Sequence, residues 1–150
     1  MTKILLIQGP NMAYLGRREP EHYGTTTAAE LDALCRGHAD EHGYELEIFY
    51  THIEGEAIGR VYQAVDDGTD VLVMNPAGMT YAGYPMRDCL KAVAPELPYI
   101  EVHVRNNEAR GVHSIPGEAA AGIVAAFGMN SYLLGLEAAL LLAGHRPGWS

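Results

Sequence analysis

Apolar residues gather in short runs along the chain, and segments with helical spacing of apolar residues lie between these runs. The runs predict strands at residues 3–8, 44–50, 70–74, 98–104 and 119–127. The intervening segments predict helices at residues 28–43, 54–65, 84–94 and 131–143. Strands that alternate with helices form a parallel sheet with helices on both faces. The pattern therefore favours an α/β, flavodoxin-like fold with a five-stranded parallel sheet in the order 2-1-3-4-5.

The predicted strands differ in how they are expected to be covered. Residues 70–74, DVLVM, are almost continuously apolar, which is typical of a central strand covered on both faces. Residues 44–50 alternate apolar residues with glutamates, which predicts a half-exposed strand at a sheet edge. Residues 119–127 are rich in alanine, which also favours helix. With no repeat or linker in the sequence, residues 1–150 are predicted to form a single domain.

The composition is that of an ordinary globular protein, with 48% apolar and 19% charged residues. The net charge of −9 gives no support to a nucleic-acid partner, and no apolar stretch reaches the length of a membrane span. The start of the chain carries no signal-peptide pattern, and Cys35 and Cys89 do not indicate a disulfide framework. We therefore expect a reduced, cytoplasmic protein with neither nucleic acid nor membrane as a partner.

One helical segment contains residues with metal-like spacing. Cys35, His38 and His42 could share one face of the helix predicted at residues 28–43. The sequence indicates no further ligand, so a solvated or packed helix face is the preferred interpretation. We expect no metal site.

Three common occupants of such a fold are excluded by the residues that follow the first strand. The glycines there, Gly9, Gly16 and Gly24, are too widely spaced for a dinucleotide-binding turn, and no GxGxxG is present. The lysine of a phosphate-binding loop is missing as well. A phospho-acceptor domain would have acidic residues where Gln8 and Gly9 stand.

The strand predicted at residues 98–104 contains ionisable residues in an alternating pattern. Glu101, His103 and the following Arg105 fall on one face, because successive side chains of a strand point to opposite sides. Buried charges are costly unless they are paired. A carboxylate beside a histidine fixes the tautomer of the ring and stabilises its protonated form. His103 is therefore a candidate proton donor, with a salt-linked edge strand as the alternative interpretation.

The loop after the first strand contains a second candidate pair. Tyr23 follows Arg17 and Arg18 in a polar segment between the first strand and the Thr-rich start of the first helix. A free tyrosine is only about 0.1% ionised at neutral pH, so a tyrosine base needs its pKa lowered by roughly three units. One close arginine supplies about one to three of these units. Tyr23 with Arg18 is thus a candidate base, with a surface cluster as the alternative.

Together these motifs resemble the type II 3-dehydroquinate dehydratase family over nearly the whole chain. The segment GPNMAYLGRREPEHYG resembles the opening signature of that family. HIEGEAIGRVY, MNPAGMTYAGYPMRD and PYIEVHVRNNEAR resemble its second helix, third-strand loop and fourth strand. GIVAAFGMNSYLLGLEAAL resembles its last strand and helix.

The resemblance implies a flavodoxin-like subunit, commonly assembled as a dodecamer of trimers, that needs no cofactor or metal. It implies that Tyr23 is the base activated by Arg18, and that Asn11 helps to hold an enolate. His103 would be the acid, positioned by Glu101, and closure of the loop at residues 17–23 would exclude water. The other matched positions are implied to contact the substrate, with Asp88 reaching a neighbouring subunit: Asn75, Tyr81, Asp88, Val104, Arg105 and Arg110.

The sequence departs from the family pattern at substrate-reading positions. Tyr81 stands where the family has histidine, and Arg105 stands where it has a small hydroxyl residue. The segment after Arg110 is shortened and lacks a second arginine, and residues 50–52 lack the usual QSN-like pattern. Lost contacts to substrate hydroxyls change discrimination strongly. Three functions therefore remain open: dehydration of 3-dehydroquinate to 3-dehydroshikimate, related chemistry on another hydroxy-keto acid, and binding of a small keto acid without catalysis.

Overall fold

The computed structural model describes residues 1–17 and 19–145, without the side chains of His22, Tyr23 and His145. These residues form a sheet of five parallel strands in the order β2-β1-β3-β4-β5, which confirms the predicted topology. The strands are β1 (Lys3–Gln8), β2 (Glu45–Tyr50), β3 (Val71–Asn75), β4 (Tyr99–His103) and β5 (Gly122–Ala125).

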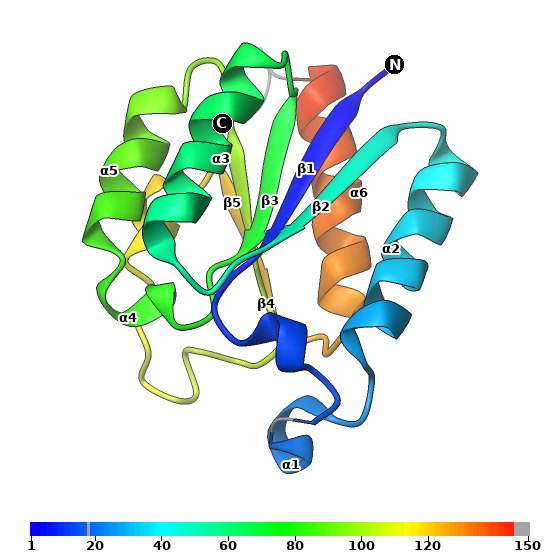
Figure 1. Cartoon of the computed structure of the whole chain (residues 1–150), viewed down its shortest axis with the longest axis vertical. Helices are drawn as coiled ribbons and strands as arrows, with labels where there is room; N and C mark the ends of the chain where they lie inside the picture. The colour runs from blue at the N-terminus through cyan, green and yellow to red at the C-terminus, as the bar shows by residue number, and fades with distance from the viewer. Residues whose placement is uncertain (18, 146–150) are drawn as a thin grey trace.

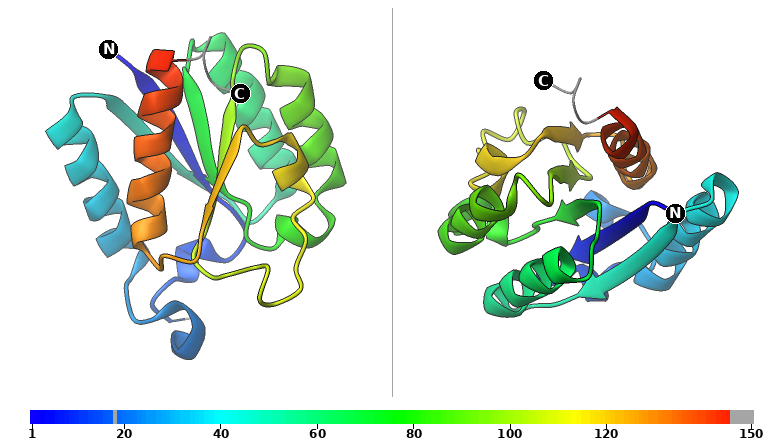
Figure 2. Two further views of the ribbon diagram at one scale, coloured as in Figure 1. Left: turned by 180° about the vertical axis from the view of Figure 1, so that it is seen from behind. Right: turned by 90° about the horizontal axis from the view of Figure 1, so that it is seen from above.

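Helices cover both faces of the sheet (Figures 1 and 2). The long helices are α2 (Ala28–His42), α3 (Glu54–Asp66), α5 (Tyr84–Val93) and α6 (Asn130–His145). The short ones are η1 (Met12–Tyr14), α1 (Pro20–Tyr23), α4 (Met79–Ala82) and η2 (Pro116–Ala119). One apolar core joins α2 and α6 to the sheet, and a second core joins α3 and α5 to its other face. The result is a layered α/β/α arrangement.

The strand patterns account for these two cores. In β1, Ile4 and Leu6 belong to the core under α2 and α6, whereas Leu5 and Ile7 belong to the core under α3 and α5. Alternate side chains of a strand point to opposite faces, so a strand covered on both faces must be apolar throughout. Strand β2 lies at the sheet edge, and its glutamates, Glu45 and Glu47, are exposed on either side of the buried Leu46, as the sequence predicts.

The structure corrects several details of the sequence interpretation. Strand β5 begins at Gly122, because Pro116 starts η2 and the alanines that follow complete this turn before the strand begins. The four-residue helices α1 and α4 were not predicted, since one turn of helix has no periodicity to detect. Strand β4 pairs with β3 and β5, so the alternative of a salt-linked edge strand is wrong.

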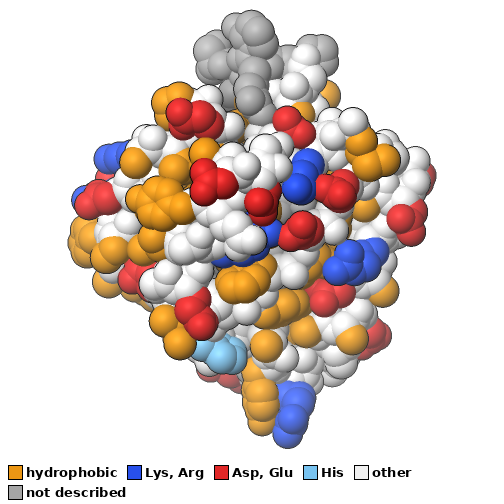
Figure 3. All heavy atoms as spheres, turned by 45° about the horizontal axis from the view of Figure 1, so that its top comes forward, with side chains coloured by type: hydrophobic (Ala, Val, Ile, Leu, Met, Phe, Trp, Pro, Cys, Tyr) orange, Lys and Arg blue, Asp and Glu red, His pale blue; other side chains and the backbone are white. Residues whose placement is uncertain are grey.

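One face of the molecule carries a mixed charge pattern. On the face that Figure 3 shows, acidic side chains are spread widely and basic side chains lie among them. Within the described residues, none of the helices combines the length and the apolar character needed to cross a membrane.

Candidate active site

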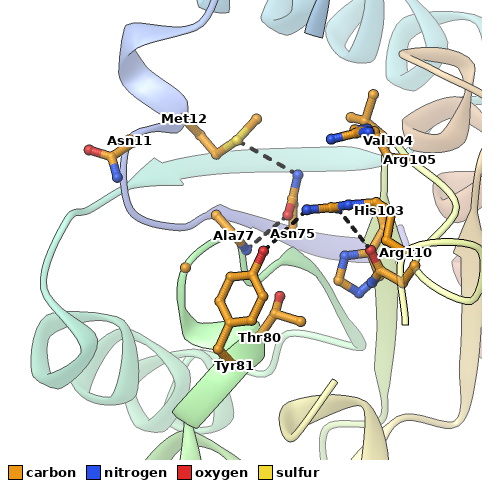
Figure 4. A pocket seen from close by; sticks show the side chains of 12 residues that line it. Asn11, Met12, Asn75, Ala77, Thr80, Tyr81, His103, Val104, Arg105 and Arg110 are labelled. Carbon is orange, nitrogen blue, oxygen red and sulfur yellow. Dashed lines mark hydrogen bonds between the residues drawn. The ribbon is translucent and has the colours of Figure 1, made fainter. Parts of the chain in front are cut away.

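A small pocket lies at the carboxyl ends of β1, β3 and β4, where open α/β sheets bind their ligands. Its volume of about 110 Å³ is below the range of about 300–1,000 Å³ that drug-sized ligands occupy. It therefore suits a single small ring. The lining includes seven of the residues predicted from the sequence: Asn11, Asn75, Tyr81, His103, Val104, Arg105 and Arg110 (Figure 4).

His103 lines this pocket and is paired with the buried Glu101, which lies behind it. Their side chains lie on the same face of β4, as strand alternation predicts, and Nε2 of His103 donates to Oε2 of Glu101 at 2.7 Å. Glu101 is fully buried and His103 is 7% exposed. Since a carboxylate only accepts hydrogen bonds, it fixes the proton of the ring on Nε2. Only the other ring nitrogen, Nδ1, is left to exchange a proton with a bound molecule.

Two further residues hold the Glu101 carboxylate in place. The Tyr99 hydroxyl donates to Oε1 of Glu101 at 2.7 Å. Burial raises the pKa of Tyr99 well above its usual value of 10.0, and the charge of Glu101 and this hydrogen bond raise it further. Tyr99 is therefore a permanent donor. On the other side, a Cβ at Gly117 would lie 2.8 Å from Oε2, so the backbone can approach the carboxylate closely only with glycine there.

Asn75, at the end of β3, is oriented by three contacts. Its Nδ2 donates to the Tyr132 hydroxyl at 2.8 Å and lies 3.7 Å from the sulfur of Met12. Its Oδ1 accepts from the backbone N–H of Ala77 at 2.9 Å. The Tyr132 hydroxyl in turn donates to Oε1 of Gln8 at 2.7 Å. This network of hydrogen bonds fixes the orientation of the Asn75 amide at the pocket wall.

Asn11 directly precedes η1 and has a left-handed backbone conformation with φ of 71°. Its backbone N–H donates to Nδ1 of His52 at 3.0 Å. The loop that carries Asn11 starts at Gly9, where a Cβ would lie 2.6 Å from the carbonyl oxygen of Pro76. Glycine at this position therefore allows the loops after β1 and β3 to touch, and this contact places Asn11 and Asn75 on one pocket.

Two arginines and a tyrosine line the outer part of the pocket. Arg110 donates from Nη2 to the Tyr81 hydroxyl at 3.3 Å and from Nη1 to Oδ1 of Asn107 at 3.3 Å (Figure 4). Arg105 is half-buried, and no hydrogen bond or ion pair joins its guanidinium to another residue of the described chain. A guanidinium without a partner at a pocket wall is suited to bind a carboxylate in a bidentate manner. The pocket is thus locally basic in an acidic chain.

The remaining predicted site residues lie elsewhere or outside the described part of the chain. Arg18 is not among the described residues, and of Tyr23 only the backbone, at the end of α1, is described. Their pairing stays a prediction. Asp88 does not line the pocket, because it lies on α5 with its side chain 71% exposed and contacts Arg87.

The sequence did not reveal three residues that hydrogen-bond to site residues without lining the pocket: Tyr99, Tyr132 and His52. Tyr99 could have been found, because it precedes Glu101 by two positions and shares its strand face. Tyr132 and His52 gave no such signal. They reach Asn75 and Asn11 across 57 and 41 residues of sequence, and only the fold brings them together.

A doubly wound sheet with a buried Glu101–His103 pair and two arginines at its carboxyl edge defines a flavodoxin-like protein with a candidate site for proton transfer on a small anionic molecule. The comparison with known proteins gives the particular family. Residues 2–140 match the family described as dehydroquinase class II, and the chain belongs to this family.

Individual relatives agree over almost the full length. A curated protein of Stenotrophomonas maltophilia, named 3-dehydroquinate dehydratase, is 40% identical over 144 residues, which cover 94% of this chain and 97% of that protein. The crystal structure of type II dehydroquinase from Butyrivibrio crossotus superposes with a TM-score of 0.88 at 31% identity, covering 93% of this chain and 97% of that one. The enzyme from Propionibacterium acnes gives 0.85 at 37% identity, with coverage of 96% and 97%.

Proposed function

We propose that this protein eliminates water from 3-dehydroquinate to give 3-dehydroshikimate through an enolate. The observation that carries the proposal is the buried Glu101–His103 pair beside a pocket that also contains Arg105. A general acid must reach the departing group from a dry, fixed position, and the pair meets this requirement. Membership of the dehydroquinase class II family supports the same chemistry.

The proposed mechanism has two proton transfers, one to a base in the first step and one from an acid in the last step. Tyr23, activated by Arg18, removes a proton from the carbon next to the ketone, and Asn11 stabilises the negative charge of the enolate. The enolate then expels the β-hydroxyl group, a carbon–carbon double bond forms, and His103 protonates the departing oxygen to give water. Glu101 compensates the positive charge of the His103 ring before the proton leaves it.

The test is an absorbance assay for the conjugated enone with purified protein and 3-dehydroquinate. Replacement of His103 by alanine should lower kcat by about 10²–10⁴-fold, the usual contribution of one general acid or base. Tyr23→Phe and Arg18→Ala should reduce kcat at least as strongly, whereas Tyr62→Phe on the exposed part of α3 is the matched control. Equal rates for Tyr23→Phe and the native protein would refute the base assignment. Absence of absorbance change at high enzyme concentration would refute the activity itself.

Arg105 and the Tyr81–Arg110 contact favour a second candidate, the same elimination on another β-hydroxy keto acid. We propose that Arg105 binds the substrate carboxylate in either case. Loss of its charge-assisted hydrogen bonds, worth about 1.5–3 kcal/mol, should lower kcat/KM in Arg105→Ala by about 10–150-fold. Side-by-side kcat/KM values for 3-dehydroquinate and other cyclic hydroxy-keto acids distinguish the two substrates. Tight binding of the keto acid without turnover would instead identify a binding protein.

We further propose a homo-oligomer built from trimers, with a dodecamer as the expected assembly. The exposed carboxylate of Asp88, away from the pocket of its own chain, supports a role at a neighbouring subunit. Sedimentation velocity tests the assembly. Asp88→Asn should lower activity in the assembled protein, while Glu96→Gln beyond the end of α5 should not.

A further inference from the structure

Two helices on one face of the sheet bring together side chains that the sequence keeps far apart. Helices α2 and α6 lie side by side (Figures 1 and 2). His38 and His42 lie one turn apart on α2, and Glu137 on α6 is close to both. Nε2 of His38 is 3.1 Å from Oε1 of Glu137, and Nε2 of His42 is 2.9 Å from the same oxygen. One potential ligand atom from each residue lies within 4.8 Å of the others. We propose that these three residues form a site for a divalent transition metal ion, zinc above all, that joins α2 to α6.

Nδ1 of each ring makes a hydrogen bond of the kind that usually orients a metal-binding histidine. Nδ1 of His42 lies 2.9 Å from the backbone carbonyl oxygen of His38, and a carbonyl oxygen only accepts, so this Nδ1 carries a proton. Nδ1 of His38 lies 2.8 Å from the Tyr44 hydroxyl and can donate to it. With Nδ1 protonated in each ring, the lone pairs of both Nε2 atoms are free for a metal. Such second contacts orient the imidazole ligands of most protein metal sites.

The spacing of the ligand atoms fits zinc. Tetrahedral zinc with bonds of 2.0–2.2 Å to nitrogen and oxygen separates two of its ligand atoms by about 3.3–3.5 Å. The nitrogen-to-oxygen distances of 2.9 and 3.1 Å are within about half an ångström of this value. The two imidazole rings are stacked with their centroids 4.0 Å apart, so both side chains would rotate to turn their Nε2 atoms toward one ion. Two histidines and one carboxylate are also a ligand set that zinc uses, with water at the open position.

The electrostatics of the cluster call for a cation between the rings and the carboxylate. Two neutral rings with lone pairs on Nε2 would both face an anionic oxygen at hydrogen-bond distance, which is repulsive. Without a metal, Nε2 of His42 must carry an additional proton, and His38 can donate from Nε2 to Glu137 as the neutral tautomer whose Nδ1 accepts from the Tyr44 hydroxyl. In the proposed site one divalent ion takes the place of both Nε2 protons. The ion pairs of Glu137 within the described residues are with these two histidines alone, so no lysine or arginine there competes for the carboxylate.

The cluster is accessible and distant from the pocket. The side chains of His38, His42 and Glu137 are 9%, 33% and 46% exposed, so an ion can enter from solvent. Helix α2 runs antiparallel to the strands it connects, which places its last turn at the amino end of the sheet, opposite the pocket. The metal would thus act as a clamp between two helices. Cys35 does not take part, because it is fully buried in the core.

The experiment uses the full chain without a histidine tag, freed of metal with a chelator and titrated with zinc chloride in a calorimeter. We expect one zinc ion per chain and, at a hundred times Kd, a rise in Tm of about 5–10 °C. His42→Asn and Glu137→Gln should abolish both effects. Glu41→Gln, an exposed acidic neighbour on α2, is the matched control and should leave both unchanged. Tyr44→Phe should weaken zinc binding by about 10–100-fold, as expected for a residue that orients a ligand.

Cobalt(II) in place of zinc adds a spectroscopic test, because its visible bands report the coordination geometry. Intense bands that vanish in Glu137→Gln support a four-coordinate site made by this carboxylate. Two results would overturn the proposal: no heat and no change in Tm at millimolar zinc, or binding that persists unchanged in both His42→Asn and Glu137→Gln. The Tm of each metal-free variant shows whether it is folded before zinc is added.

Discussion

The substitution Glu101→Gln tests the proposed acid without changing the shape of the site. In the native protein the carboxylate accepts two hydrogen bonds, from Nε2 of His103 and from the Tyr99 hydroxyl, each at 2.7 Å. The glutamine amide has only one oxygen, so it can accept one of these bonds and must present its NH₂ group to the other partner. The orientation of the amide therefore decides the protonation state of the histidine.

The buried hydroxyl of Tyr99 determines which orientation of the glutamine amide is more stable. If the amide oxygen faced His103, the Tyr99 proton would have no acceptor, at a cost of about 1–3 kcal/mol. The amide oxygen will therefore face Tyr99, and the NH₂ group will donate to Nε2 of His103. The ring must then keep its proton on Nδ1 and cannot become a stabilised imidazolium. Only about one molecule in 5 to 150 would keep the native tautomer, by the Boltzmann factor for this cost.

We expect kcat for the elimination to fall by about 10²–10⁴-fold in Glu101→Gln, because the His103 ring loses both its native tautomer and the negative charge beside it. KM should change little, since Glu101 lies behind His103 and does not line the pocket wall that contains the arginines. The assay is the enone absorbance at saturating substrate, with circular dichroism as the control for folding.

The double variant Tyr99→Phe/Glu101→Gln tests whether the Tyr99 hydroxyl sets the orientation of the amide. Without the Tyr99 hydroxyl the amide can turn its oxygen to His103, so kcat should recover by about 5–150-fold relative to the single Glu101→Gln variant. A nearly native kcat in the single variant Glu101→Gln would show that the carboxylate is not needed for proton transfer. A double variant no faster than the single variant would refute the role given to Tyr99.

Three further outcomes follow from buried and capping contacts. Tyr132→Phe should lower the free energy of unfolding in urea by about 1–3 kcal/mol and also reduce kcat/KM, because Asn75 and Gln8 lose their shared partner. Burial raises the pKa of Cys35 to about 12, with the nearby charge of Asp32 as a smaller cause, so the native thiol should resist a disulfide reagent at pH 8 and react only after unfolding. Thr27→Ala should cost about 0.5–2 kcal/mol in the same urea experiment, since the capping box at the start of α2 is lost.

The sheet and part of the site could be predicted because they depend on local patterns. The alternation of five strands with helices favoured the order 2-1-3-4-5, and the apolar run of β3 and the glutamates of β2 indicated a central and an edge strand. The alternation in β4 placed Glu101 beside His103. These features depend only on a period of two residues and on burial. They are properties of a segment and need no knowledge of its neighbours.

The remaining contacts could not be predicted, because they depend on how distant segments pack. Glu137 was not expected near His38 and His42, since 95 or more residues separate it from them in sequence. The histidines were correctly placed on one helix face, but the third ligand comes from α6 and replaces Cys35, which faces the core. Helical spacing indicates which residues share a face, and it does not indicate what that face meets.

The site combines residues that the fold fixes with residues that it leaves free. Glu101 and Asn75 are buried, and each is held by at least two hydrogen bonds from the core. Tyr81 and Arg110 are exposed and contact each other, and Arg105 has no partner within the described chain. A change at the buried positions would leave polar groups unpaired and would destabilise the protein, whereas a change at the outer positions alters only what the pocket binds. Tyr81 and Arg105, the positions at which the sequence interpretation expects a departure from the family pattern, therefore lie where the fold restricts the sequence least. On this basis we expect the substrate to be easier to change than the reaction.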